Sequence, residues 1–178
     1  KGQRPVPAGL KPIRLAPTGQ VALYQSGDIY WNYLESRFGS RFLEYRRRWR
    51  ETSERGDSGG FPLSLDLALN TGCQLSCLMC PLPSRPEARR TALMDEKLYR
   101  RLMAKGSEHS LPALTLGRGS EPLFTPHTHP WIELAVQAGI MDIRLGTNGL
   151  LLNEDMSAAL VESGLTRLEI SVDASRPE

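Results

Sequence analysis

The chain has 178 residues, which is enough for one medium-sized domain with a hydrophobic core, or for one domain plus an extension. It carries 22 basic and 20 acidic side chains, and no apolar run approaches the roughly 18 residues of a membrane span. The N-terminus lacks a signal-peptide pattern, so composition argues against a membrane protein or a secreted precursor and predicts a soluble globular protein.

The basic side chains are concentrated near the N-terminus. Residues 1–60 have 11 basic and 6 acidic side chains, whereas residues 61–178 have 11 and 14. The excess includes four arginines within residues 46–50, a run that could meet an acidic partner such as nucleic acid or an acidic peptide. Because Glu44, Glu51 and Glu54 lie in the same segment as these arginines, we favour a solvated helix face and expect no nucleic-acid partner.

The first 60 residues are expected to form an arm and a helical extension. Residues 1–18 are rich in Pro and Gly, and residues 21–24 have the pattern of a short strand. Across residues 29–54, aromatic side chains recur at spacings of three and four, which predicts a helix that Gly39 divides in two. We expect this aromatic stripe to pack against the next domain rather than to bind a ligand. The Gly-rich residues 55–60 are interpreted as the linker to a domain over residues 61–178.

Beyond the linker, predicted strands alternate with predicted helices. The strands cover residues 63–69, 113–116, 142–146 and 167–172, and the helices lie near residues 94–102, 130–138 and 153–163. This alternation is typical of parallel βαβ units.

Each predicted strand has one aliphatic and one small or polar face. A parallel strand that is buried on both sides would be apolar on both. The polar set therefore predicts the lining of a cavity, as in an open barrel with its site inside. Its members include Asp66, Asn70, Thr115, Arg144, Glu169, Ser171 and Asp173.

The three cysteines, Cys73, Cys77 and Cys80, lie within eight residues directly after the first strand. An odd number this closely spaced cannot form a disulfide framework, which favours a reducing cytoplasm. Thiolates bind iron well, and three of them can hold three irons of a cubane while the fourth iron stays open.

Two other interpretations of the cysteines are weaker. A zinc site would need a fourth ligand from His109, His127 or His129, and none has finger-like spacing. The pair His127 and His129 lies between prolines in a predicted loop, and we do not expect it to bind metal. Structural thiols are the other, weaker interpretation.

The C-x3-C-x2-C spacing after a strand resembles the signature of the radical S-adenosylmethionine (radical SAM) superfamily. The resemblance implies a [4Fe–4S] cluster on Cys73, Cys77 and Cys80, with S-adenosylmethionine chelated at the open iron. Reductive cleavage of that cofactor gives methionine and a 5′-deoxyadenosyl radical. Met79 takes the usually aromatic position that packs on adenine, and C-x-M-C-P is similar to relatives with C-terminal auxiliary-cluster (SPASM or twitch) domains.

The segment Gly-Arg-Gly-Ser-Glu-Pro-Leu at residues 117–123 resembles the GGEP element of that family. The resemblance implies that Gly119, Ser120 and Glu121 hold the amino group of the methionine moiety. Ser120 replaces the second glycine of the element, and its Cβ restricts the approach of the backbone.

Two later elements also resemble the family and lie at strand ends, where barrel sites are assembled. Residues 147–149 resemble its TNG element, which implies a cofactor contact for Asn148. Residues 171–173 resemble its S-x-D pattern, which implies that Ser171, together with Asp173, binds the ribose or carboxylate.

The expected fold is thus α/β: a partial (β/α) barrel of the radical SAM type, preceded by a mostly helical extension. The family barrel has six βα units and this sequence contains four strands, so we expect the front part of a longer, trimmed polypeptide. Asp66, Arg144 and Glu169 are candidate substrate contacts. The alternative for Arg144 and Glu169 is an ion pair across neighbouring strands.

The expected function is hydrogen abstraction by a cytoplasmic enzyme that receives electrons from a donor such as flavodoxin or ferredoxin. The N-terminal extension does not resemble a peptide-recognition winged helix. This favours a sugar or antibiotic precursor as substrate, with a ribosomally made peptide as the alternative. From other classes, an iron–sulfur electron-transfer or scaffold protein and a zinc-binding interaction module stay open.

Overall fold

The computed structural model describes residues 27–56, 60–81 and 92–172. The arm, the strand predicted at residues 21–24 and Asp173 lie outside these residues. The chain has two compact units, Lys1–Leu43 and Glu44–Glu178. The described elements, in chain order, are α1 (Gly27–Phe38), α2 (Ser40–Arg55), β1 (Ser64–Leu67), α3 (Glu96–Glu108), β2 (Ala113–Leu116), the 3₁₀ turn η3 (Pro122–Phe124), α4 (Thr128–Gln137), β3 (Asp142–Thr147), α5 (Glu154–Glu162) and β4 (Arg167–Ile170).

The N-terminal region is helical, as expected. Gly39 adopts a φ of +55° between α1 and α2, which confirms that it divides the helical segment. Within the first unit the rings of Trp31 and Phe42 stack at 5.9 Å. Among the described residues, none of the helices has the length and apolar character needed to cross a membrane.

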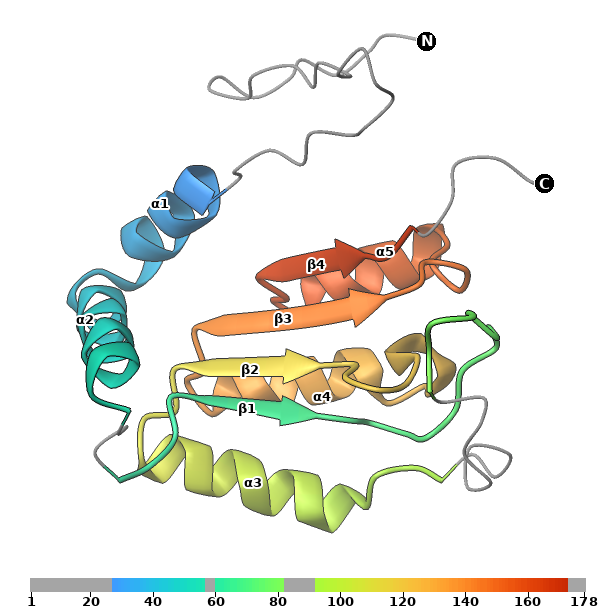
Figure 1. Cartoon of the computed structure of the whole chain (residues 1–178), viewed down its shortest axis with the longest axis horizontal. Helices are drawn as coiled ribbons and strands as arrows, with labels where there is room; N and C mark the ends of the chain where they lie inside the picture. The colour runs from blue at the N-terminus through green and yellow to red at the C-terminus, as the bar shows by residue number, and fades with distance from the viewer. Residues whose placement is uncertain (1–26, 57–59, 82–91, 173–178) are drawn as a thin grey trace, which may run out of the picture. The chain divides into compact units, whose positions relative to one another are not determined.

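The second unit is built on a four-stranded parallel sheet in the order β1-β2-β3-β4 (Figure 1). Each strand pairs with the next one along the chain, and Leu65, Leu114 and Ile143 lie side by side in the register. This confirms the predicted βαβ alternation. Helix α3 begins at a capping residue: Asp95 accepts a hydrogen bond from the backbone of Leu98 at 2.8 Å.

The core lies between the sheet and the helices that follow its strands. The aliphatic side chains of β2 and β3 are fully buried there, packed with Tyr99 of α3, Ile132 of α4 and Leu160 of α5. The Tyr99 and Trp131 rings stack at 4.5 Å. The predicted aliphatic face of the sheet is therefore the helix-covered face. At β4 the same face is less covered, and Ile170 is 49% exposed.

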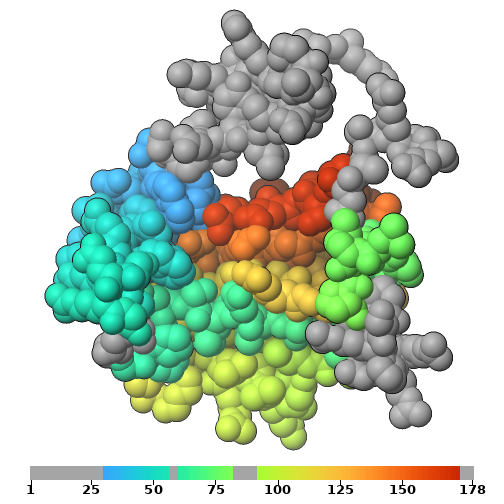
Figure 2. Space-filling view, in the orientation of Figure 1, coloured from blue at the N-terminus to red at the C-terminus, as the bar shows by residue number. Residues whose placement is uncertain are grey.

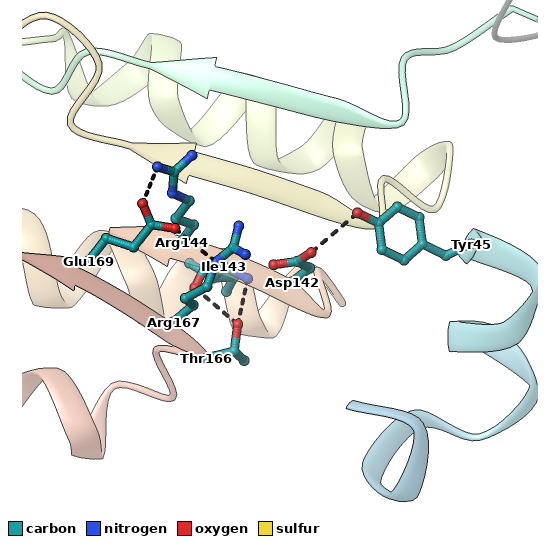
Figure 3. Close-up of polar contacts among 7 residues, drawn as sticks. All are labelled: Tyr45, Asp142, Ile143, Arg144, Thr166, Arg167 and Glu169. Atoms are coloured by element: carbon teal, nitrogen blue, oxygen red, sulfur yellow. Dashed lines mark hydrogen bonds and ion pairs between the residues drawn. The ribbon is translucent and has the colours of Figure 1, made fainter. Parts of the chain in front are cut away.

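The amino end of β3 is tied to α2. Tyr45 of α2 is buried, and its hydroxyl donates a hydrogen bond of 3.2 Å to Asp142, the first residue of β3 (Figure 3). Burial and, secondarily, the negative charge of Asp142 raise the pKa of the Tyr45 hydroxyl above its usual range, so it keeps its proton. Next to this contact, the Thr166 side chain bridges to the backbone of Ile143 and fixes the entry into β4.

Gly117 allows the loop after β2 to pass close to β3. Its φ is +92°, and a Cβ at this position would lie 2.5 Å from the carbonyl oxygen of Gly146. Gly119, two residues later, has a φ of +73°, but no atom lies within 4 Å of the point where its Cβ would be. The two glycines thus share a left-handed backbone, and only Gly117 adds a steric conflict.

Replacement of each glycine by alanine separates the two effects. Gly119→Ala is expected to lower the free energy of unfolding by about 1–2 kcal/mol, the cost of a left-handed backbone for an L-residue. Gly117→Ala is expected to lose a further ~1–3 kcal/mol because the backbone must shift to relieve the overlap. Urea unfolding of both variants measures the difference, and equal losses would contradict the close approach.

Candidate functional site

The loops that follow β1, β2 and β3 meet at the carboxyl edge of the sheet, as parallel strands require. They carry the cysteines, residues 117–121 and residues 147–149 respectively. Figure 1 shows the loop after β1 extending beyond the arrowheads of the strands, and in Figure 2 its green atoms lie at the surface at that end. The cysteine loop, residues 117–121 and Asn148 are therefore gathered at one edge.

The Glu121 carboxylate lies at the centre of this edge. Glu121 is only 2% exposed. Its Oε1 accepts hydrogen bonds from the Thr147 hydroxyl at 2.7 Å and the Leu123 backbone at 3.0 Å, and its Oε2 accepts one from the backbone of Asn148 at 2.8 Å. Three donors compensate the carboxylate for the loss of water. The side chain therefore joins the loop after β2 to the end of β3.

Asn70 joins the same loop to the end of β1. Its Nδ2 donates to the carbonyl oxygen of Glu121 at 2.9 Å, and its Oδ1 accepts from the backbone of Gly72 at 2.7 Å. The backbone N–H of Glu121 donates to the carbonyl of Gly72 at 2.9 Å. The sequence predicted that Asn70 lines an open cavity, which is wrong, because it is 2% exposed and linked to both loops.

The three cysteines are half-buried on the loop after β1. The Cys80 backbone donates to the Cys77 carbonyl at 3.0 Å, which closes a turn. The Cys73 sulfur accepts hydrogen bonds from the backbone of Leu75 at 3.5 Å and from the Asn148 side chain at 3.7 Å. Within the described ranges, no three His, Cys, Asp or Glu side chains converge closely enough to hold a metal ion. Three thiols on one loop are nevertheless the type of ligand that binds an iron–sulfur cluster.

The side chain of Ser120 also indicates a ligand at this edge. Its Oγ is buried and has no hydrogen-bond partner in the protein. Buried hydroxyls are normally paired, so this atom fits a contact with a bound molecule. Met79 is 74% exposed on the cysteine loop, and Ser171 is exposed where its backbone bonds to the carbonyl of Thr147 at 2.9 Å.

The candidate substrate residues form ion pairs on the sheet face that is turned away from the core. Arg144 of β3 pairs with Glu169 of β4, and Arg167 also lies near Glu169, at 3.4 Å (Figure 3). Asp66 of β1 pairs with Arg118 at 3.1 Å. The alternative interpretation of Arg144 and Glu169, an ion pair across neighbouring strands, is what the structure shows.

The sequence analysis missed Arg118, Arg167 and Gln74. Gln74 donates to the side chain of Asn148 at 3.2 Å. Arg118 lies between the two glycines of the 117–121 loop, and Arg167 starts β4 on the polar face. Strand alternation could have found Arg167, but the other two depend on loop conformation.

Two of the three histidines contact aromatic rings. His109 stacks on Phe61 with ring centroids 4.3 Å apart, and His127 stacks on Trp131 at 5.5 Å. These contacts assign packing roles to both histidines.

Glu121→Gln tests how strongly the buried carboxylate holds this edge together. The amide would turn an N–H₂ group toward backbone or hydroxyl donors, so we expect a loss of about 3 kcal/mol in the free energy of unfolding. Glu162→Gln makes the same change at an exposed position of α5 and is expected to stay within about 0.5 kcal/mol of the original. Urea unfolding at neutral pH compares the two, and equal values would show that the network contributes nothing.

Comparison with known proteins gives the family. Residues 67–178 match the model of the radical SAM superfamily. A GTP 3′,8-cyclase of Synechococcus sp. (strain CC9902) is 34% identical over 123 residues, which cover 67% of this chain and 34% of that protein. A probable GTP 3′,8-cyclase of Methanothermobacter thermautotrophicus is 34% identical over 125 residues, covering 68% of this chain and 39% of that protein. The chain thus spans a little over a third of the length of these relatives.

A similar fold occurs in a solved structure. The crystal structure of BtrN in complex with AdoMet and 2-DOIA matches with a TM-score of 0.59 and 22% identity, covering 65% of this chain and 48% of that one. The likeness supports the partial barrel that the sequence predicted. By the match over residues 67–178, the chain belongs to the radical SAM superfamily, whose enzymes use a [4Fe–4S] cluster and S-adenosylmethionine.

Proposed function

We propose that this chain forms the cluster- and cofactor-binding part of an enzyme that reductively cleaves S-adenosylmethionine and abstracts a hydrogen atom from a small-molecule substrate. The observation that carries the proposal is the convergence of the cysteine loop, the unpaired Ser120 hydroxyl and Asn148 at one sheet edge, with the buried Glu121 carboxylate between them.

Cys73, Cys77 and Cys80 are the proposed ligands of the cluster. The loop is attached to its neighbours through Asn70 and Gly72 at one end and through the Cys73 sulfur near Asn148. When bound, the cluster supplies an electron from a donor such as flavodoxin or ferredoxin and an open iron that holds the cofactor.

The proposed contacts of S-adenosylmethionine come from four segments of the chain. Gly119 and Ser120 hold the methionine amino end through the backbone and the unpaired hydroxyl, and Glu121 keeps their loop in shape through its buried hydrogen bonds. The exposed Met79 packs on adenine. Ser171, Asp173 and Asn148 complete the proposed set toward the ribose and carboxylate.

A phosphorylated nucleotide is the proposed substrate class. The relatives at 34% identity are named for an activity on GTP. The polar sheet face carries the guanidinium groups of Arg118, Arg144 and Arg167, a chemistry that suits phosphate. Asp66 and Glu169 pair with these arginines. In the proposal, both carboxylates exchange these partners when substrate binds. This replaces the sugar or antibiotic precursor expected from the sequence.

Loss of one cysteine is expected to remove both the cluster and the reaction. After anaerobic reconstitution with iron and sulfide, the full chain should form a brown, dithionite-reducible cluster, and S-adenosylmethionine should yield 5′-deoxyadenosine. Cys77→Ala should abolish both signals. Ser76→Ala, an exposed neighbour on the same loop, should retain both. A reducible cluster without any cleavage, even with substrates present, would instead indicate an electron-transfer or scaffold protein.

The substrate class is tested by the dependence of 5′-deoxyadenosine formation on added compounds. GTP is expected to raise its rate of formation at least tenfold over the rate without substrate, and Arg144→Met should raise the GTP concentration needed for half the effect. Thermal unfolding of Arg144→Met checks that the loss of its ion pair leaves the fold intact. Stimulation by a sugar, an antibiotic precursor or a peptide, and none by GTP, would contradict the nucleotide proposal.

A further inference from the structure

The backbone of Asn148 is fixed where β3 ends. Its N–H donates to Glu121 Oε2 at 2.8 Å, and the preceding Thr147 hydroxyl donates to the other oxygen of the same carboxylate at 2.7 Å. Because Glu121 is buried, these bonds are shielded from water. Asn148 therefore starts the loop after β3 from a defined position.

Two donors determine which way the Asn148 side-chain amide faces. The backbone N–H of Leu150 lies 3.0 Å from Oδ1, and Gln74 Nε2 lies 3.2 Å from it. A backbone N–H can only donate, so the atom that faces it must be the amide oxygen. The amide nitrogen is then the group directed at the Cys73 sulfur, 3.7 Å away.

The Cys73 sulfur accepts from two different kinds of donor. The Leu75 N–H, at 3.5 Å, belongs to the backbone of the cysteine loop itself, and side-chain substitutions do not remove it. The Asn148 amide comes from a loop 75 residues away and is removable by a single substitution. This makes the contribution of Asn148 separately measurable.

We propose that Asn148 is a positioning residue that donates a hydrogen bond to the Cys73 thiolate and thereby raises the reduction potential of the cluster held there; this inference rests on the proposed function. A cluster becomes more negative when it accepts an electron, and N–H donors directed at a ligating sulfur stabilise that extra charge. Through Asn148, the buried Glu121 carboxylate also determines where this donor lies.

Asn148→Asp replaces the amide nitrogen with an oxygen and keeps an acceptor for the Leu150 N–H. Asn153→Asp is the matched control, because Asn153 caps α5 by accepting from the Met156 backbone at 2.8 Å, and aspartate retains this function. Both substitutions add the same charge, but only one does so beside the thiol.

The midpoint potential of the reconstituted cluster, followed by electron paramagnetic resonance, gives the readout. Asn148→Asp is expected to weaken electron uptake about tenfold relative to the original chain, a shift of about 59 mV to more negative potential for a one-electron couple. Asn153→Asp should leave the midpoint unchanged, and circular dichroism should show both variants folded. Equal midpoints in the two variants would overturn the proposal.

A second measurement needs no cluster. In the cluster-free full chain, solvent exchange of the Asn148 side-chain amide protons, measured by nuclear magnetic resonance, should become at least threefold faster in Cys73→Ala and stay unchanged in Cys80→Ala. Unchanged exchange in Cys73→Ala would overturn the hydrogen bond. If the original chain bound no cluster at all, the proposed function would fail, and the exchange rates would still decide the contact.

Discussion

The buried carboxylate of Glu121 is the constraint on which the carboxyl edge of the sheet depends. A carboxylate removed from water costs several kcal/mol unless donors replace the water, and here the donors come from the loop that carries it and from the end of β3. Its own backbone bonds to Asn70 and Gly72 add the loop after β1. The relative positions of three loops therefore follow from where one side chain is buried.

This arrangement separates two tasks within a short stretch of chain. Glu121 is directed inward and organises the edge, whereas the preceding Ser120 has a buried hydroxyl that no protein group satisfies. Gly117, whose Cβ position is filled by a carbonyl oxygen of β3, brings the whole stretch close to the neighbouring strand. A rigid support and a site with unused hydrogen-bonding capacity are thus adjacent in sequence.

Much of the fold could be predicted because its determinants are local and periodic. Alternating leucines indicated β1, and Gly39 separated two helices, both as observed. The polar face of the sheet was also predicted from alternation. Within it, the sequence left the pairing of Arg144 with Glu169 open, because the same side chains suit a ligand or each other.

The details of the edge could not be predicted, because they depend on contacts between residues far apart in the chain. Asn70 has the periodicity of a cavity-lining residue, but its amide is used to join two loops. The N–H of Leu150, two residues along the chain, orients the amide of Asn148, but only the fold places the Cys73 sulfur, 75 residues away, opposite its nitrogen. Such orientations are set by tertiary structure.

β3 is tied at both ends, to α2 through the bond between Tyr45 and Asp142 and to the cysteine loop through Asn148. Its six residues, each rising about 3.3 Å, separate these two attachments by roughly 20 Å. A peptide segment that starts beside the amino end of β3 would need at least about six fully extended residues to reach the thiols. The strand thus sets a minimum length for any part of the chain that is to cover the cysteines from that side.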